Sequence, residues 1–288
     1  MNKQRFDSFI RKNLTADGRT DFGYALSKIY ENYDSRQAFS RFLQEMRANY
    51  PDAFLAYSRG KGSELREQAG RYGKTPPKMA SLASSSRFCY LALRDGASAL
   101  GGGRAVFEHE RRIDGVDGIA PQMDAFVPED EIYVEVKCHE IFDAHHAVLK
   151  RKYWEKIYGV ENAFGFPIRE LPSGETFEIP LSVFGISKRT TRFDIKQFLC
   201  HLMGIASRPN RQKTARLVYL FFKPRMDCPR EMEEIQQVFD ELREEIRCIF
   251  RSDPIRRFLT ANQIQLEAVA EYTQTMGPLR QDNMIVLF

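Results

Sequence analysis

Within residues 121–140 (PQMDAFVPEDEIYVEVKCHE), the side chains of Asp124, Glu135 and Lys137 have a spacing that could form a reactive site. Two apolar runs flank the turn-like cluster at 128–131, a pattern typical of a β-hairpin. Antiparallel pairing across that turn places Asp124 directly opposite Glu135, and strand alternation puts Lys137 on the same face as Glu135. Directly opposed carboxylates repel each other unless a cation lies between them. We therefore predict a divalent-metal site on this face of the hairpin.

The chemistry expected of such a site is metal-assisted hydrolysis of a phosphodiester bond. Mg²⁺ is held in proteins by one or two carboxylates and keeps several waters, which suits Asp124 and Glu135. A metal bound there would polarise a phosphoryl oxygen and lower the pKa of a bound water. Lys137 could orient that water and stabilise the charge that develops on the phosphate.

Asp124, ten intervening residues and then Glu135-Val136-Lys137 resemble the signature of the PD-(D/E)XK nuclease superfamily, which has the restriction-endonuclease-like fold. The chain looks most like the bacterial restriction endonucleases of that superfamily. The resemblance implies that Asp124 and Glu135 bind Mg²⁺, or Mn²⁺ in its place, with help from the backbone carbonyl of Val136. It also implies that Lys137 is catalytic. Met123 stands where the proline that names the motif would lie, a position that varies widely across the superfamily.

The resemblance covers about residues 79–223 and implies two further site residues. Many members of the superfamily carry an additional glutamate ahead of the hairpin. Glu108 is the candidate in this chain, with Glu110 on the same strand face as the alternative. Some members carry a glutamine on a later core helix, and Gln197 fits that position.

Other interpretations of the same residues stay open. Glu135 and Lys137 could lie on the solvated face of an ordinary antiparallel surface hairpin. The chain could also bind nucleic acid without cutting it, or be a structural or interaction protein. One cysteine and three histidines within residues 138–146 suggest zinc, but their spacing and the lack of a second cysteine pair argue against a zinc site.

Charge is segregated along the chain. Residues 104–149 hold eleven acidic and four basic residues, a net charge of −7 around the proposed metal site. Residues 187–225 hold ten basic residues and one acidic residue, a net charge of +9. Such a basic segment is expected beside a phosphate backbone, so DNA is the expected partner, with RNA as the alternative. The residues proposed to contact nucleic acid are Lys188, Arg189, Arg192, Lys196, Arg208, Arg211 and Lys213.

The hydrophobic pattern predicts a mixed α/β fold, and the resemblance implies a mixed central sheet flanked by helices, with a helical N-terminal extension. Asp194 is expected to cap a helix, with Gln197 as the other half of a capping box. Val127 is expected to pair with Ile132 in the hairpin. The predicted helices lie within 1–57 and over 79–94, 139–158, 195–206 and 230–250. The predicted strands are 104–110, 122–127, 132–138, 214–222 and 262–272, and 58–78 is expected to be a loop around a short helix.

Whole-chain composition limits the class of protein. The 288 residues carry a net charge of +4, which excludes a uniformly basic tail and an acidic disordered protein. With 43% hydrophobic residues, the chain can bury a sizeable core. No secretory signal or run of about 18 apolar residues is seen, and five cysteines are scattered, so we expect a reduced cytoplasmic protein without a membrane partner.

We expect one nuclease domain over 1–288. It would comprise a helical extension and basic loop (1–78), the nuclease-like core (79–223) and a C-terminal helix and strand (224–288). A symmetric dimer would be the simplest way to cut both strands of a duplex.

Overall fold

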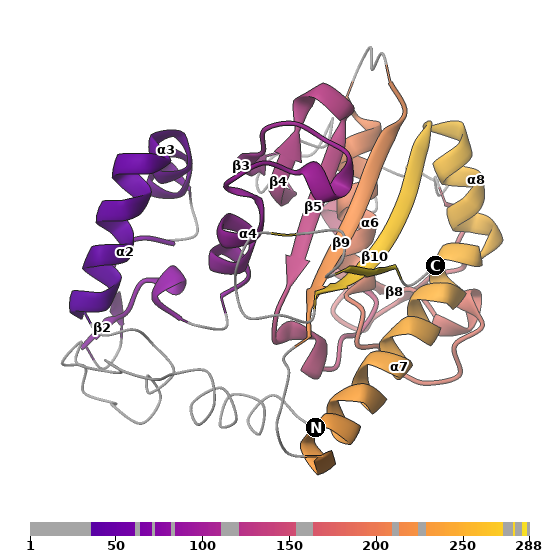
Figure 1. Ribbon diagram of the computed structural model, residues 1–288. Helices are drawn as coiled ribbons and strands as arrows, with labels where there is room; N and C mark the ends of the chain where they lie inside the picture. Colours follow the sequence, from indigo (N-terminus) through magenta and orange to yellow (C-terminus); the bar gives the residue numbers. More distant parts are fainter. Residues whose placement is uncertain are drawn as a thin grey trace.

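The structure is a computed structural model that describes residues 36–60, 64–70, 73–81, 84–110, 121–153, 164–208, 213–223, 229–272, 279 and 284–286. Within these ranges a six-stranded mixed sheet runs through the middle of the molecule (Figure 1). From edge to edge its strands are β11 (Met284–Val286), β10 (Ile264–Tyr272), β9 (Ala215–Phe222), β5 (Ile132–Lys137), β4 (Gln122–Val127) and β3 (Val106–Glu110). β5, β9 and β10 are mutually parallel, and the other neighbours are antiparallel. The fold class is therefore mixed α/β, as predicted.

Helices cover both faces of this sheet (Figure 1). The α-helices are α2 (Arg36–Asn49), α3 (Pro51–Arg59), α4 (Ser85–Leu93), α6 (Ile195–Ala206), α7 (Pro229–Arg251) and α8 (Asp253–Ala261). The short 3₁₀ helices are η2 (Lys78–Ala80), η3 (Ser98–Leu100), η4 (Pro128–Asp130), η5 (Glu140–Phe142) and η6 (Leu181–Phe184). Two small sheets complete the described structure: β1 (Gln68–Gly70) with β2 (Gly73–Thr75), and β6 (Val148–Lys150), β8 (Thr176–Glu178) and β7 (Arg169–Glu170).

Each face of the main sheet has its own hydrophobic core. One core joins α2, α3 and α4 to the sheet, and the other joins α6, α7 and α8 to the opposite face. Along β5 the side chains alternate between the two cores, with Val134 and Val136 in the first and Tyr133 in the second. A strand buried on both faces is typical of the centre of a sheet with helices on each side.

The longest predicted elements are confirmed. The apolar stripe expected on α7 is buried over its whole length, from Ile235 to Ile249. At the start of α6 the Asp194 carboxylate accepts a hydrogen bond from the backbone N–H of Gln197 at 2.9 Å, which confirms the predicted cap. No helix in the described part of the chain is long and apolar enough to cross a bilayer.

Two regions differ from their predictions where the structure describes them. The 58–78 region, expected to be a loop around a short helix, contains an antiparallel pair, β1 with β2, in which Gly70 lies opposite Gly73. In the 139–158 region, η5 is followed by β6, which pairs with β8, so its backbone groups are satisfied across the small sheet. Over 148–150 such pairing outweighs helical periodicity in a short segment. Residues 151–153 are helical, as predicted, and residues 154–158 lie outside the described ranges.

Candidate active site

The β4–β5 hairpin brings the two predicted metal ligands together. Its strands pair in the predicted register, with Val127 opposite Ile132, and the regular pairing ends one position before Asp124 and Glu135. At that point the Asp124 carboxylate accepts a hydrogen bond from the backbone N–H of Val136 at 2.7 Å. A side-chain acceptor thus replaces the next backbone bond of the ladder and holds this carboxylate against β5.

The site lies in the interior of the molecule. Glu135 is only 3% exposed, and the side chain of Lys137 is 13% exposed. The alternative of an ordinary solvated hairpin face is therefore wrong. Burying a carboxylate or an ammonium group is costly unless each is paired, so the partners of these two groups decide what the site can do.

Gln197 on α6 connects the two charged groups. The ammonium of Lys137 lies 2.6 Å from Glu135 Oε1 and donates to the side-chain carbonyl oxygen of Gln197 at 2.5 Å. The amide nitrogen of Gln197 in turn donates to Glu135 Oε1 at 2.8 Å. The structure therefore brings Gln197 into the site, as the resemblance implied. Its side chain serves these contacts rather than the second half of the predicted capping box.

If Asp124 and Glu135 are both ionised, the cluster carries an excess of negative charge. Burial, and then the nearby charge of Glu135, raise the pKa of Asp124 well above its ordinary value. Burial alone would lower the pKa of Lys137, but the charges of Glu135, Glu140 and Asp124 outweigh it and raise that pKa above its usual range. Lys137 is therefore held as an ammonium that can compensate one carboxylate but not two.

The available oxygens fit a hard divalent cation. The second carboxylate oxygen of Glu135 is buried without a hydrogen-bond partner. Asp124, Glu135 and the carbonyl of Val136 could supply the few protein oxygens that Mg²⁺ needs, with water completing its coordination. In the part of the chain that the structure describes, no three His, Cys, Asp or Glu side chains are grouped to hold a metal on their own, and this includes the residues 138–146 considered for zinc. A cation here would depend on water ligands.

Space for water lies next to the lysine. A cavity of about 60 Å³ is lined by Lys137, Gln197, Asp194, His145 and Arg192, among others. That volume accommodates several water molecules, and its polar lining offers them hydrogen-bond partners.

Glu108 lies on β3, next to Asp124 on β4. Phe107 and His109 on either side of it are paired with β4, but Glu108 itself leaves the ladder with a φ of +54°. Non-glycine residues adopt such angles rarely, and they concentrate at functional sites. The carboxylate accepts a hydrogen bond from Gln122 at 2.7 Å. Glu110, the alternative auxiliary carboxylate, is exposed.

Burial, and then the charge of Glu64, raise the pKa of Glu108 to about 7. Glu64 was missed by the sequence interpretation because it belongs to the basic 58–78 region, far from the motif. It is 5% exposed; one oxygen pairs with Lys78 at 3.2 Å, and the other is buried without a hydrogen-bond partner. The charge of Glu108 also raises the pKa of Asp124, so the acidic groups influence each other across three strands and a loop.

His201 was also missed, although the sequence carried a signal for it. It follows Gln197 by four residues on α6, a spacing that places both on the same helix face. Its Nε2 lies 3.6 Å from Glu135 Oε2, and its Nδ1 lies 3.0 Å from the hydroxyl of Tyr219. Burial lowers the pKa of His201, so the ring is held neutral behind Glu135.

The basic residues proposed for nucleic-acid binding separate into two groups. The first group surrounds the start of α6, close to Gln197. Here Lys188 and Arg192 both reach Glu241 of α7, at 3.6 and 2.7 Å. Arg189 and Lys196 are exposed and make no hydrogen bond or ion pair with any other described residue.

The second group lies at the other end of α6 and β5. Arg208 forms an ion pair with Glu131, and Lys213 lies 3.8 Å from Asp130. These two residues therefore stabilise the start of β5 and are not brought to the carboxylate cluster. Arg211 lies outside the described residues.

Replacing Glu108 with glutamine is expected to stabilise the metal-free protein at pH 8 but not at pH 4. Below the ordinary pKa of 4.5 the carboxyl is protonated in both the folded and the unfolded chain. Between pH 4.5 and about 7 the unfolded chain ionises while the folded chain does not, so the folded state loses stability, and the loss is complete above about pH 7. The glutamine avoids this loss, a difference of up to about 3 kcal/mol in the free energy of unfolding. Urea unfolding at both pH values measures it, with exposed Glu110→Gln as control; an equal effect at both pH values would contradict the prediction.

Comparison of the chain with models of protein families, with curated proteins and with solved structures found no match.

Proposed function

We propose that this chain is a metal-dependent endonuclease that hydrolyses DNA phosphodiester bonds, with a restriction-endonuclease-like core. The observation that carries the proposal is the buried cluster of Asp124, Glu135 and Lys137, joined by Gln197. A purely structural cluster would compensate its charges internally, whereas this one holds two carboxyl groups for one ammonium, resists ionisation of Asp124 and has a buried carboxylate oxygen without a hydrogen bond. A bound cation would remove that imbalance.

Each side chain has a defined part in the proposed reaction. Asp124 and Glu135 would hold the cation, which supplies Lewis acidity and lowers the pKa of a bound water. Lys137 remains an ammonium and would donate hydrogen bonds to the attacking water or to a phosphate oxygen, stabilising the charge that develops there. Gln197 and Glu135 fix the position of that ammonium, and pre-orientation of this kind avoids reorganisation during the reaction.

The environment of the cluster supports the same reaction. Glu108 lies beside Asp124 and would serve as an auxiliary carboxylate; with its pKa of about 7 it can accept a proton near neutral pH. The cavity beside Lys137 offers room for water. Arg189 and Lys196 near the start of α6 could contact phosphates on either side of the reacting one.

The main alternative is a protein that binds nucleic acid without cutting it. A protein that only binds nucleic acid would not require Lys137 at this position. It would also have no reason to keep two neighbouring carboxyl groups in its interior. The intact set of aspartate, glutamate and lysine therefore favours cleavage over binding alone.

Incubation of supercoiled plasmid with the protein and Mg²⁺ or Mn²⁺ tests the proposal. We expect nicked or linear DNA with metal and none with EDTA, and linear product without a nicked intermediate would indicate a dimer that cuts both strands. Asp52→Asn serves as the matched control for Asp124→Asn, since this exposed aspartate forms an ion pair with exposed Arg104 at 2.8 Å, away from the cluster. DNA binding without cleavage would support the binding-only alternative. Absence of cleavage together with absence of metal binding in calorimetry would refute the proposal.

A further inference from the structure

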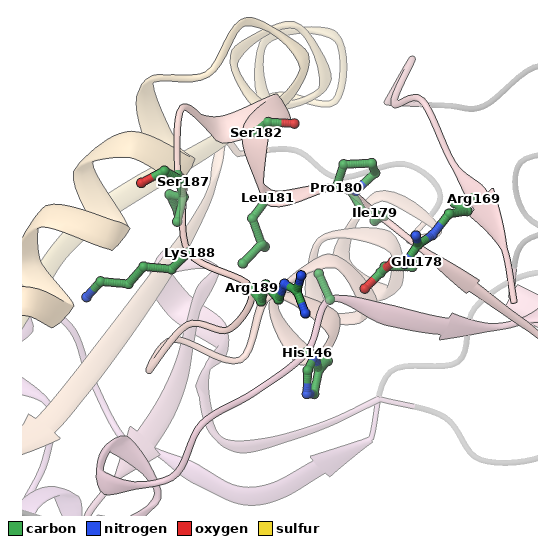
Figure 2. A pocket seen from close by; sticks show the side chains of 12 residues that line it. His146, Arg169, Glu178, Ile179, Pro180, Leu181, Ser182, Ser187, Lys188 and Arg189 are labelled. Carbon is green, nitrogen blue, oxygen red and sulfur yellow. Dashed lines mark hydrogen bonds and ion pairs between the residues drawn. The ribbon is translucent and has the colours of Figure 1, made fainter.

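A cavity of about 590 Å³ lies close to the candidate active site, between the small β6–β8–β7 sheet, η6 and the segment that leads into α6 (Figure 2). Its volume falls within the range of pockets that hold small organic molecules, about 300–1,000 Å³. The function proposed above does not use this cavity.

The lining combines an apolar floor with cationic groups at the rim. Ile179, Leu181 and Ile186 contribute buried apolar side chains. Figure 2 shows the side chains of Leu181, Arg189 and His146, from three separate segments, converging on the same space. An apolar surface bordered by cations suits a ligand with a flat, weakly polar body and an attached anion.

Arg189 is the cation best placed to hold such an anion. Lys188 points away from the centre of the cavity in Figure 2 and reaches Glu241 on α7, 3.6 Å away. Arg169, at the opposite rim, is engaged in an ion pair with Glu178. Arg189 alone among these three has no ion pair or hydrogen bond with another described residue. A guanidinium offers planar, bidentate hydrogen bonds that match the oxygens of a phosphate.

The cavity adjoins the candidate active site through one backbone bridge. His145 and Thr191 exchange backbone hydrogen bonds of 2.8 and 2.9 Å. His145 lines the small cavity beside Lys137, whereas His146, the next residue, lines the large one. Consecutive residues of one segment therefore line the two spaces, so one polynucleotide could reach both.

We propose that this cavity binds one nucleotide of the nucleic-acid strand, next to the phosphate that reacts at Lys137. The base would lie out of the stack against the apolar floor, and its phosphate would be bound by Arg189. Enzymes that act on nucleic acids enclose unstacked bases in pockets of this kind, and guanidinium planes also stack on bases. This inference rests on the proposed function in that it assumes a nucleic-acid substrate, but binding at the cavity does not require catalysis.

The test uses Asp124→Asn as a background, so that cleavage cannot interfere. Deoxyadenosine 5′-monophosphate and inorganic phosphate are titrated separately by calorimetry. We expect the mononucleotide to bind more tightly than phosphate. Arg189→Ala should weaken its binding about tenfold, the loss of one strong ionic contact. Ser182→Trp places a large side chain in the cavity from an exposed position, so it should abolish binding without disturbing the core. Arg230→Ala, an exposed arginine on α7, removes the same charge elsewhere and should leave binding unchanged.

A second measurement tests whether a base of a nucleic-acid strand enters the cavity. A single-stranded oligonucleotide with 2-aminopurine at one position should become more fluorescent when that base leaves the stack and enters the cavity, and Ser182→Trp should remove the increase. Equal binding of phosphate and mononucleotide would overturn the proposal and reduce the cavity to an anion site. Absence of mononucleotide binding in a protein that cleaves plasmid would overturn it while leaving the proposed function intact. Mononucleotide binding without any plasmid cleavage would support the cavity and count against the nuclease.

Discussion

Replacing Lys137 with methionine is expected to lower the rate of plasmid cleavage about a thousandfold, with DNA binding retained. The ammonium lies 2.6 Å from Glu135 and is oriented by its hydrogen bond to Gln197, so it is a cation fixed beside the carboxylates. Removing a single well-oriented group that stabilises charge in a transition state costs about 10²–10³ in rate, and loss of water orientation adds to this. Initial cleavage rates at saturating Mg²⁺ measure the effect.

The same substitution also removes the partner of a buried carboxylate, and the two consequences must be separated. Loss of one member of a buried ion pair destabilises a protein by about 3–5 kcal/mol, so the Met variant should unfold at a lower temperature than the wild type. Lys137→Arg keeps a charge beside Glu135 but moves the donor atoms. We expect the arginine variant to recover most of the stability and little of the cleavage. If activity followed stability in both variants, Lys137 would have a structural role only.

Replacing Asp124 with asparagine is expected to stabilise the metal-free protein and to abolish its stabilisation by Mg²⁺. Because burial and the charge of Glu135 raise the pKa of Asp124, its contribution to stability is present at low pH and is lost as the pH rises through that pKa. Asparagine does not ionise, and its side-chain oxygen can still accept the hydrogen bond from Val136 N–H. A gain of roughly 1–2 kcal/mol, appearing as the pH rises above the ordinary pKa of 3.8, is the size expected when a functional site is relieved of an unfavourable group.

The change in stability on adding Mg²⁺ tests the role of Asp124 more directly than the stability of the metal-free protein does. A cation that binds only the folded state raises the free energy of unfolding by about 2.7 kcal/mol at a concentration 100 times its Kd. We therefore expect Mg²⁺ to raise the melting temperature of the wild type and of Asp52→Asn, and to leave that of Asp124→Asn unchanged. A Mg²⁺-dependent shift that persists in Asp124→Asn would place the cation elsewhere and remove the basis for the proposed mechanism.

Much of the candidate site could be predicted because it is local. Side chains alternate along a strand, and a hairpin with a short turn has few registers available, so the positions of Asp124, Glu135 and Lys137 relative to one another follow from residues 121–140. The apolar stripe of α7 was equally local, since helical periodicity determines which of its residues face the core.

Groups that come from distant segments could not be placed in this way. The sequence predicted Gln197 both for a helix cap and for the site. The packing of α6 against β5 shows that its side chain reaches Glu135 and Lys137. Its backbone N–H donates to the cap residue Asp194. Glu64 reaches the acidic cluster from a region that was expected to be a basic loop.

The distribution of charged residues along the chain follows from the sequence, whereas the partner of each charged side chain depends on the tertiary structure. The sequence by itself determined that a +9 segment follows the acidic region, and that Asp124 and Glu135 lie on the two strands of one hairpin. Only the tertiary structure decided that Arg208 stabilises the start of β5 through Glu131, while Arg189 lines a cavity beside the site without an ion pair to any other described residue. The reason is physical: alternation and helical periodicity act between near neighbours, whereas the pairing of charges depends on which distant surfaces are buried against each other.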